Sequence, residues 1–182
     1  MKILRIRGEN LASLHAPFSI DLTEGVLGQA GLFAIIGPTG AGKSTLLDAI
    51  CLCLYDSTPR LEKSGGAAVY APGQDPESAL TANDQRNVLR RGAGMGWAEV
   101  DFRDGDGAVW TARWEVRRAR QRAQGRAQQQ SLSLRDAAGQ AYGGTKTETL
   151  AAIRQRIGLD FEQFRRSLLL AQGDFAAFLR AD

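Results

Sequence analysis

The sequence predicts an α/β fold with a mixed sheet that includes an antiparallel β-meander. An apolar run at residues 31–36 leads through a glycine-rich turn into an apolar segment at 44–55. This order of strand, turn and helix is typical of a sheet covered by helices. Three segments in the second half of the chain then alternate between apolar and polar residues, as half-buried strands do.

The first part of the chain is predicted to supply the middle of the sheet and its main helix. Residues 3–8 and 18–22 alternate as strands. Residues 31–36 are apolar on both faces, so we expect a strand buried in the middle of the sheet. Residues 44–55 are apolar almost all the way round, which indicates a helix packed deep against the sheet.

Residues 56–96 differ in composition from the segments on either side. Pro59, Pro72 and Pro76 occur there among many Gly, Ala, Asp and Asn residues. We therefore expect a long, partly irregular insertion, with a short helix at 84–91.

The rest of the chain is predicted to form the meander and two helices. Residues 97–103, 108–118 and 130–136 alternate as strands, and a basic β-hairpin covers 108–136. The turn 104–107, with the sequence DGDG, joins the first two strands. A helix follows over residues 145–158, where threonines can cap its start and Gly158 ends it, and another follows over 160–171.

Composition indicates one globular domain, residues 1–182. Hydrophobic residues make up 43% of the chain, and the formal charge of +3 only mildly favours polyanionic partners. Cys51 and Cys53 point to different sides of the expected helix, so small buried side chains are favoured over a disulfide or a metal site. A cytoplasmic location is expected, and no membrane partner, because no apolar run is long enough for a membrane span.

The motif GPTGAGKS at residues 37–44 predicts a phosphate-binding loop for ATP and Mg²⁺. Glycines let backbone N–H groups surround phosphates, and the following helix presents its positive end. Lys43 can bridge the β- and γ-phosphates, Ser44 can ligate Mg²⁺, and Thr45 can bond the α-phosphate. The alternative is a glycine-rich turn without a ligand. The expected nucleotide-binding residues are Gly37, Pro38, Thr39, Gly40, Ala41, Gly42, Lys43, Ser44 and Thr45.

An acidic partner for Mg²⁺ is missing from the sequence. Such a group usually ends an apolar strand, and no aliphatic run here ends in two acidic residues. Asp101 lies inside an alternating strand instead. The catalytic set of this chain is therefore predicted to be incomplete.

Several segments together resemble the N-terminal head segment of the SbcC family. They are MKILRIRGENLASL, GLFAIIGPTGAGKSTLLDAICLCLY, LRRGA with AEVDF, and LLLAQGDFAAFL. The family comprises SMC-like, ABC-type ATPases of DNA double-strand-break repair. The resemblance implies a split head, in which a C-terminal segment, reached through a long coiled coil, brings the missing acidic pair. The end of this chain at Asp182 would then lie where that coil begins.

The resemblance also implies further site residues. Gln172 would be the Q-loop residue, catalytic and beside the Mg²⁺, and the turn from Asn10 to Ser13 would lie near the nucleotide. From the residues alone, the alternative for Gln172 is a surface glutamine at a helix end, with Gly173 after it. The turn could likewise be an ordinary polar connection between two strands.

The function implied by the resemblance is ATP-driven control of DNA end processing. Two heads would dimerise around ATP and gate an SbcD-like nuclease and its access to double-stranded DNA. The expected partners are the C-terminal head segment, a second head, that nuclease and DNA. Two rival hypotheses stay open: the nucleotide-binding domain of an ABC transporter, and a small P-loop kinase or other non-repair nucleotide-binding module.

An arginine-rich stretch lies in the predicted basic hairpin. Between Arg113 and Arg126 the chain has six arginines and a single acidic residue, Glu115. Guanidinium groups suit the DNA backbone, although a solvated loop explains the same pattern. The candidate DNA contacts are Arg117, Arg118, Arg120, Arg122 and Arg126.

Overall fold

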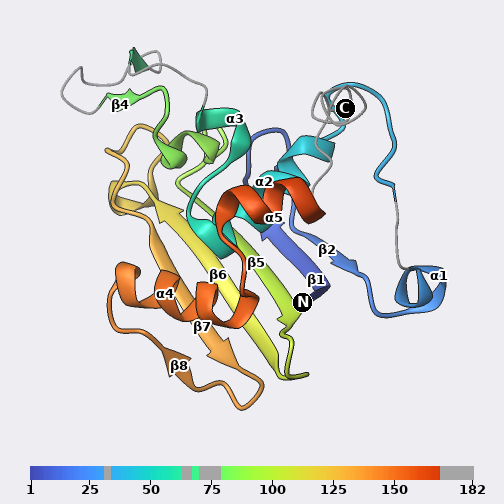
Figure 1. The fold of residues 1–182 in the computed structure, drawn as a ribbon. Coiled ribbons are helices and arrows are strands. Elements are labelled where there is room, and N and C mark those ends of the chain that lie inside the picture. Colours follow the sequence, from blue (N-terminus) through green and yellow to red (C-terminus); the bar gives the residue numbers. More distant parts are fainter. Residues whose placement is uncertain (31–33, 63–66, 70–78, 169–182) are drawn as a thin grey trace, which may run out of the picture.

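The computed structural model describes residues 1–30, 34–62, 67–69 and 79–168, and its main feature is a six-stranded sheet (Figure 1). The strand order is β2-β1-β5-β6-β7-β8, and every pairing is antiparallel. The strands are β1 (Lys2–Glu9), β2 (Phe18–Asp21), β5 (Met95–Arg103), β6 (Val109–Arg117), β7 (Ser131–Asp136) and β8 (Ala141–Tyr142). A separate short pair joins β3 (Ala68–Val69) to β4 (Leu80–Thr81).

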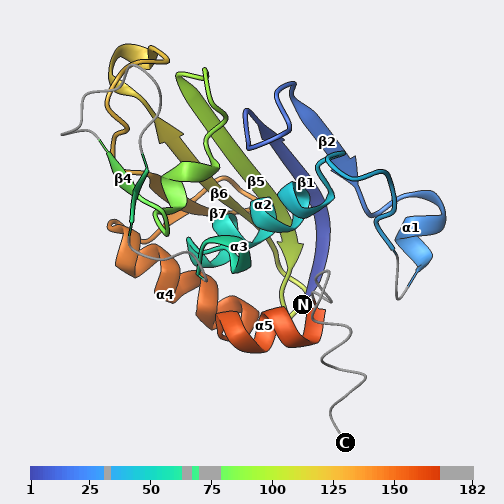
Figure 2. The ribbon, with the colours of Figure 1, turned by 90° about the horizontal axis from the view of Figure 1, so that it is seen from above.

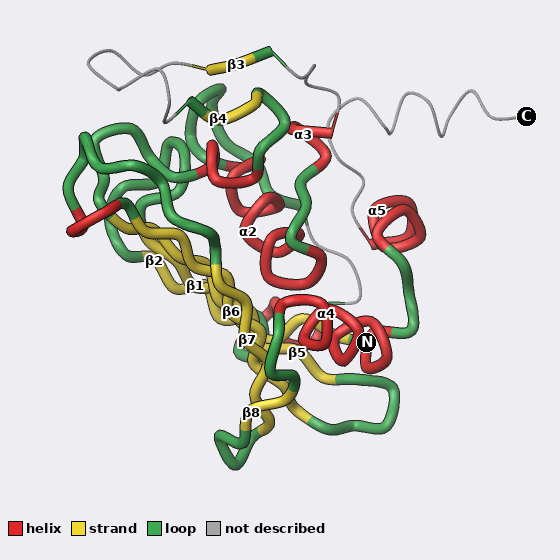
Figure 3. Tube along the Cα trace, turned by 90° about the vertical axis from the view of Figure 1, so that its left-hand side faces the viewer, coloured by secondary structure: helices red, strands yellow, loops and turns green. Residues whose placement is uncertain are grey.

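Helices α2, α4 and α5 lie on one face of the sheet (Figures 2 and 3). The helices are α1 (Gly25–Gln29), α2 (Lys43–Tyr55), α3 (Pro59–Glu62), α4 (Lys146–Ile157) and α5 (Phe161–Leu168), with 3-10 turns η2 (Gln85–Val88) and η3 (Ala119–Gln121). The core lies between these helices and the inward residues of β1, β5 and β6. The α/β class of the prediction is confirmed.

The predicted meander is confirmed in β5, β6 and β7. Buried and partly exposed residues alternate along β5 and β6, as the sequence pattern indicated. The turn between them is closed by the Asp104 carboxylate, which accepts hydrogen bonds from the N–H groups of Asp106 and Ala108 and from Nε1 of Trp110. The Asp104 carboxylate therefore holds the turn that joins β5 to β6.

Helix α2 is buried on nearly all sides, as predicted. Every residue from Asp48 to Tyr55 is buried. Cys51 and Cys53 are both fully buried in the core, and burial raises the pKa of the Cys53 thiol far above its ordinary value. The two cysteines therefore act as small apolar side chains, as expected.

Helix α4 begins and ends at the residues that the sequence indicated. The Thr145 hydroxyl accepts from the Glu148 N–H at 3.3 Å, while the Glu148 carboxylate accepts from the Thr145 N–H at 2.9 Å. This reciprocal pair is a capping box. Gly158 ends the helix in the left-handed region, with φ of 72°.

The strand expected at 31–36 is wrong in its described part. Residues 34–36 have no strand conformation, and Ile36 is 88% exposed. A strand that is apolar on both faces needs neighbouring strands and a covering layer on each side. No described strand runs beside this segment. The parallel part of the predicted mixed sheet is therefore not among the described pairings.

The expected insertion at 56–96 is only partly irregular. The 3-10 turn η2 lies inside the segment where a short helix was predicted. Val88 and Leu89 are buried and belong to the main core. Within the described ranges, no helix is long and apolar enough to cross a membrane.

Candidate nucleotide site

The glycine-rich loop and the start of α2 form the centre of the candidate site. The loop residues 34–41 are exposed, and the helix begins at Lys43. The Lys43 ammonium donates to the carbonyl oxygens of Gly37 and Pro38, both at 2.8 Å. The loop thus folds around its own lysine and holds a positive charge at the start of the helix.

The first turn of α2 differs from that of α4 in being uncapped. No side chain caps its N–H groups, and no acidic residue lies in its first turn. At α4, by contrast, Thr145 and Glu148 fill both roles. The start of α2 therefore keeps its N–H donors and its positive dipole end available to an anion. Ser44, in the same turn, is exposed.

Gly42 is required by the geometry of the loop. Its φ of 92° lies in the left-handed region, which side chains disfavour. A Cβ at this position would come within 2.5 Å of Cδ2 of Leu14. The glycine therefore lets the N-terminal turn at 10–14 approach the phosphate-binding loop closely.

The N-terminal turn reaches the first turn of α2 through Ser13. The hydroxyl oxygens of Ser13 and Thr45 lie 3.3 Å apart, and Thr45 is only 3% exposed. Asn10 lies in the same turn with φ of 55°, but in the described part of the chain its bonds are with Glu9 and Arg90 rather than with the loop. Of the two predicted turn residues, the structure brings Ser13 to the loop.

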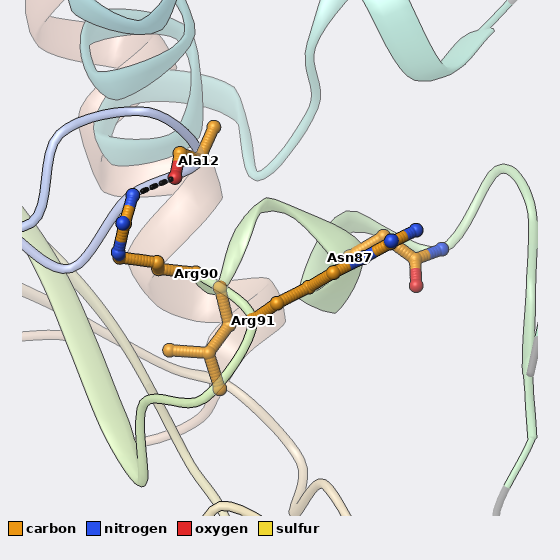
Figure 4. Close-up of a pocket in the computed structure, with 5 residues that line it drawn as sticks. Ala12, Asn87, Arg90 and Arg91 are labelled. Atoms are coloured by element: carbon orange, nitrogen blue, oxygen red, sulfur yellow. Dashed lines mark hydrogen bonds between the residues drawn. The ribbon is translucent and has the colours of Figure 1, made fainter. Parts of the chain in front are cut away.

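Arg90 forms hydrogen bonds with this turn, on the side opposite its contact with Thr45 (Figure 4). Its guanidinium donates from Nη1 to the carbonyl oxygens of Ala12 and Ser13, at 3.1 and 3.3 Å. The sequence did not predict a role for Arg90, because no local pattern indicates one. Arg90 is separated from Ala12 by 78 positions and from Ser13 by 77 positions.

An ion pair between a buried carboxylate and a partly exposed guanidinium lies one turn along α2 from the loop. The carboxylate of Asp48, one turn after Ser44 in α2, is 4% exposed and pairs with the guanidinium of Arg60 in α3. Partial burial lowers the pKa of Arg60. The pair compensates a negative charge in the core beneath the site.

Gln172, which the resemblance implies is catalytic and beside the Mg²⁺, lies outside the described residues. Among those that the structure describes, no three His, Cys, Asp or Glu side chains are grouped to hold a metal ion. Of the two predicted side-chain ligands for Mg²⁺, the described part of the chain therefore contains only Ser44, at the loop.

The arginine-rich connection between β6 and β7 is not uniformly exposed. The Arg117 guanidinium pairs with Glu115, and Arg118 is partly buried and donates to the carbonyl oxygen of Gly125 at 3.1 Å. Burial lowers the pKa of Arg118. The exposed arginines of the candidate set that have no ion pair in the described structure are Arg120, Arg122 and Arg126.

An exposed glycine-rich loop that holds its own lysine at the uncapped start of a buried helix defines a P-loop domain. The family model described as an AAA domain matches residues 5–182, so the chain belongs to that family. A Pseudomonas aeruginosa protein, named as the C subunit of the nuclease SbcCD, is 50% identical over 183 residues, covering 100% of this chain and 15% of that protein. The Rhodobacter capsulatus protein of the same name gives the same identity and the same coverage.

A more distant relative is named as an ATPase of DNA repair. The DNA double-strand break repair Rad50 ATPase of Methanopyrus kandleri is 27% identical over 187 residues, which cover 98% of this chain and 17% of that protein. This chain therefore spans about one sixth of the length of these relatives. The similarity of the sequence to the SbcC family is confirmed by these matches.

Proposed function

We propose that this chain is the ATP-binding N-terminal part of the ATPase head in an SbcC-like subunit of a DNA repair nuclease complex. The Lys43 ammonium, held by two loop carbonyls at the uncapped start of α2, is the observation that carries the proposal. Relatives that match the whole chain are named as the C subunit of a nuclease, which favours this function over a transporter or a kinase.

The residues of the loop fit a triphosphate and Mg²⁺. Lys43 would exchange its two carbonyl partners for phosphate oxygens, and the first N–H groups of α2 would bond the same anion. Ser44 would ligate Mg²⁺, and Thr45 would bond the α-phosphate. When bound, ATP supplies the γ-phosphoryl group whose transfer to water releases energy. Gln172 is proposed to orient that water near the metal ion.

Completion of the site is proposed to require other chains or segments. The described residues form no cluster of three side chains that could hold a metal ion, and we propose that a C-terminal head segment supplies the acidic partner for Mg²⁺. Two such heads would close around ATP, gate an SbcD-like nuclease and control its access to double-stranded DNA. Ile35 and Ile36 are exposed, and this observation favours the assembly. Exposed apolar residues are stabilised when strands of another segment pair with them and cover them. The assembly would act in the cytoplasm.

The arginine-rich connection is proposed to contact DNA through its exposed members. Arg120, Arg122 and Arg126 carry the proposal, since guanidinium groups bind backbone phosphates without reading bases. Arg117 and Arg118, which already have protein partners, would contribute less.

ATP turnover with and without the C-terminal head segment tests this function. The chain of residues 1–182 is expected to bind ATP but to hydrolyse it negligibly, and added C-terminal segment should restore hydrolysis. Lys43→Ala should abolish both binding and restored turnover, whereas Lys2→Ala, an exposed lysine on β1, should change neither. Rapid hydrolysis by the isolated chain that depends on Lys43 would instead favour a self-contained P-loop enzyme.

A further inference from the structure

The second half of the expected insertion lies against the N-terminal turn. The Ala12 N–H donates to the Val88 carbonyl at 2.7 Å, and the Arg90 N–H donates to the Asn10 carbonyl at 2.9 Å. Leu11 is fully buried and forms an isolated bridge with Leu89. The main chain at 88–90 therefore follows the turn residue by residue.

The side chain of Arg90 adds two charged bonds to this contact. Its Nη1 atom donates to the carbonyls of Ala12 and Ser13, while Arg91 extends in the opposite direction (Figure 4). Bonds from an ionised donor are stronger than those between neutral groups. Ala12 has a positive φ of 41°, a conformation that a non-glycine residue keeps only when its surroundings hold it.

The loop that carries Arg90 is held by bonds within residues 81–87 and by one bond to the segment before β7. Arg86 pairs with Asp84 at 2.6 Å and donates from Nη1 to the carbonyl of Ala127 at 3.3 Å. The amide of Asn87 donates to the carbonyl of Thr81 at 2.7 Å. The loop can therefore act as a fixed support for the turn.

The opposite side of the turn contacts the phosphate-binding loop. The Ser13 hydroxyl lies 3.3 Å from that of Thr45, and the Leu14 side chain occupies the space beside Gly42. Arg90, Ser13 and Thr45 thus form a continuous series of contacts that ends in the first turn of α2.

We propose that Arg90 is a positioning residue for nucleotide binding, acting through Ser13 on the Thr45 hydroxyl. This inference rests on the proposed function, because it assigns Thr45 to an ATP phosphate. The guanidinium holds the two carbonyls of the turn, the turn presents Ser13 to Thr45, and the Thr45 hydroxyl keeps the direction that a phosphate oxygen requires. The insertion then contributes to the nucleotide site without touching the nucleotide.

Affinity of the 1–182 chain for Mg·ATP, with substitutions along the series, tests the proposal. Arg90→Gln should raise the dissociation constant by about five- to tenfold, the effect of losing one or two hydrogen bonds. Arg90→Lys, which keeps a cationic donor, should recover part of the loss. Arg135→Gln, an exposed arginine on β7, removes the same charge away from the site and should have no effect.

Two further measurements separate positioning from general destabilisation. Ser13→Ala should lower affinity, and the double variant with Arg90→Gln should bind no more weakly than the worse single variant. Hydrogen exchange at the amides of Leu11, Ala12 and Leu14 should accelerate in Arg90→Gln but not in Ser13→Ala. If Arg90→Gln does not fold, the same measurements of ATP affinity, of the double variant with Ser13→Ala and of hydrogen exchange are made with Arg90→Lys.

The outcomes for this inference and for the proposed function are distinct. If wild type binds ATP, Lys43→Ala does not, and Arg90→Gln behaves as Arg135→Gln does, the positioning role is overturned alone. Additive losses in the double variant would also overturn it. If wild type and Lys43→Ala bind ATP equally, the proposed function fails, and the positioning role fails with it.

Discussion

The Asp56 carboxylate accepts a hydrogen bond from Nε1 of Trp114 at 2.7 Å, although the residues are 58 positions apart. Asp56 follows the last residue of α2 in a left-handed conformation, with φ of 50°. Its carboxylate also accepts from the amide of Gln130 at 3.0 Å and from the Lys146 ammonium at 2.7 Å. One side chain thus joins the end of the P-loop helix to β6, to the segment before β7 and to α4.

Replacement of Asp56 is expected to destabilise the whole domain. The Asp56 side chain is 7% exposed, so Asp56→Ala leaves the buried N–H of Trp114 without its acceptor. The Lys146 side chain is 38% exposed, and water can replace part of its interaction. We expect a loss of about 3 kcal/mol in the free energy of unfolding, measured with urea. Asp106→Ala, in an exposed turn, is the control; equal midpoints for the two variants would contradict the role of Asp56.

The capping box of α4 gives a pH-dependent contribution to stability. Bonds from the N–H groups of Gly144 and Thr145 lower the pKa of Glu148 below its ordinary value of 4.5. A group whose pKa is lower in the folded state stabilises the fold above its unfolded pKa, and the effect disappears as the pH falls through the folded pKa. Glu148→Gln should therefore lower Tm at pH 7, and the difference should shrink below pH 4.5. A difference that stays constant down to pH 3 would show that the charge of Glu148 is not involved.

Gly42 and Gly139 allow conformational strain to be separated from crowding. Both have positive φ, 92° and 84°, but a Cβ at Gly42 would meet Leu14, whereas one at Gly139 would meet nothing within 4 Å. Gly139→Ala should cost about 1 kcal/mol from backbone strain. Gly42→Ala should cost about 2–4 kcal/mol in total, because the overpacking of Leu14 is added. Chemical unfolding of both variants measures this; similar losses would mean that Leu14 moves away freely.

The sequence predicted the elements whose patterns are local. Alternation in β5 and β6, the threonine cap of α4 and Gly158 depend on residues a few positions apart, and all are found in the structure. The P-loop motif is equally local, and the helix predicted after it at 44–55 is found as α2, which begins at Lys43.

The features that the sequence did not predict share a different cause. Arg90, Asp56 and the pair of Asp48 with Arg60 act through contacts between separate elements, which no periodicity encodes. The strand predicted at 31–36 is wrong at 34–36, because an apolar run forms a buried strand only when partner strands are present.

DNA binding by the connection between β6 and β7 should depend on its exposed arginines. Each guanidinium that contacts a phosphate releases about 0.9 counterion, so Arg120, Arg122 and Arg126 together should contribute up to about 2.7 to the salt slope. The triple Gln variant should bind duplex DNA more weakly and with a flatter dependence on log salt, as measured by fluorescence anisotropy between about 50 and 200 mM salt.

The matched control for this variant removes the same charge elsewhere. Arg103, Arg135 and Arg154 are also exposed but lie on β5, β7 and α4, away from the connection. Their triple Gln variant loses three positive charges and should keep most of the salt slope, because long-range attraction is screened within about 10 Å at 0.1 M salt. Arg118→Gln should lower stability more than the slope, since its guanidinium bonds the Gly125 carbonyl. If both triple variants flatten the slope equally, binding follows net charge alone and the connection is not the DNA contact.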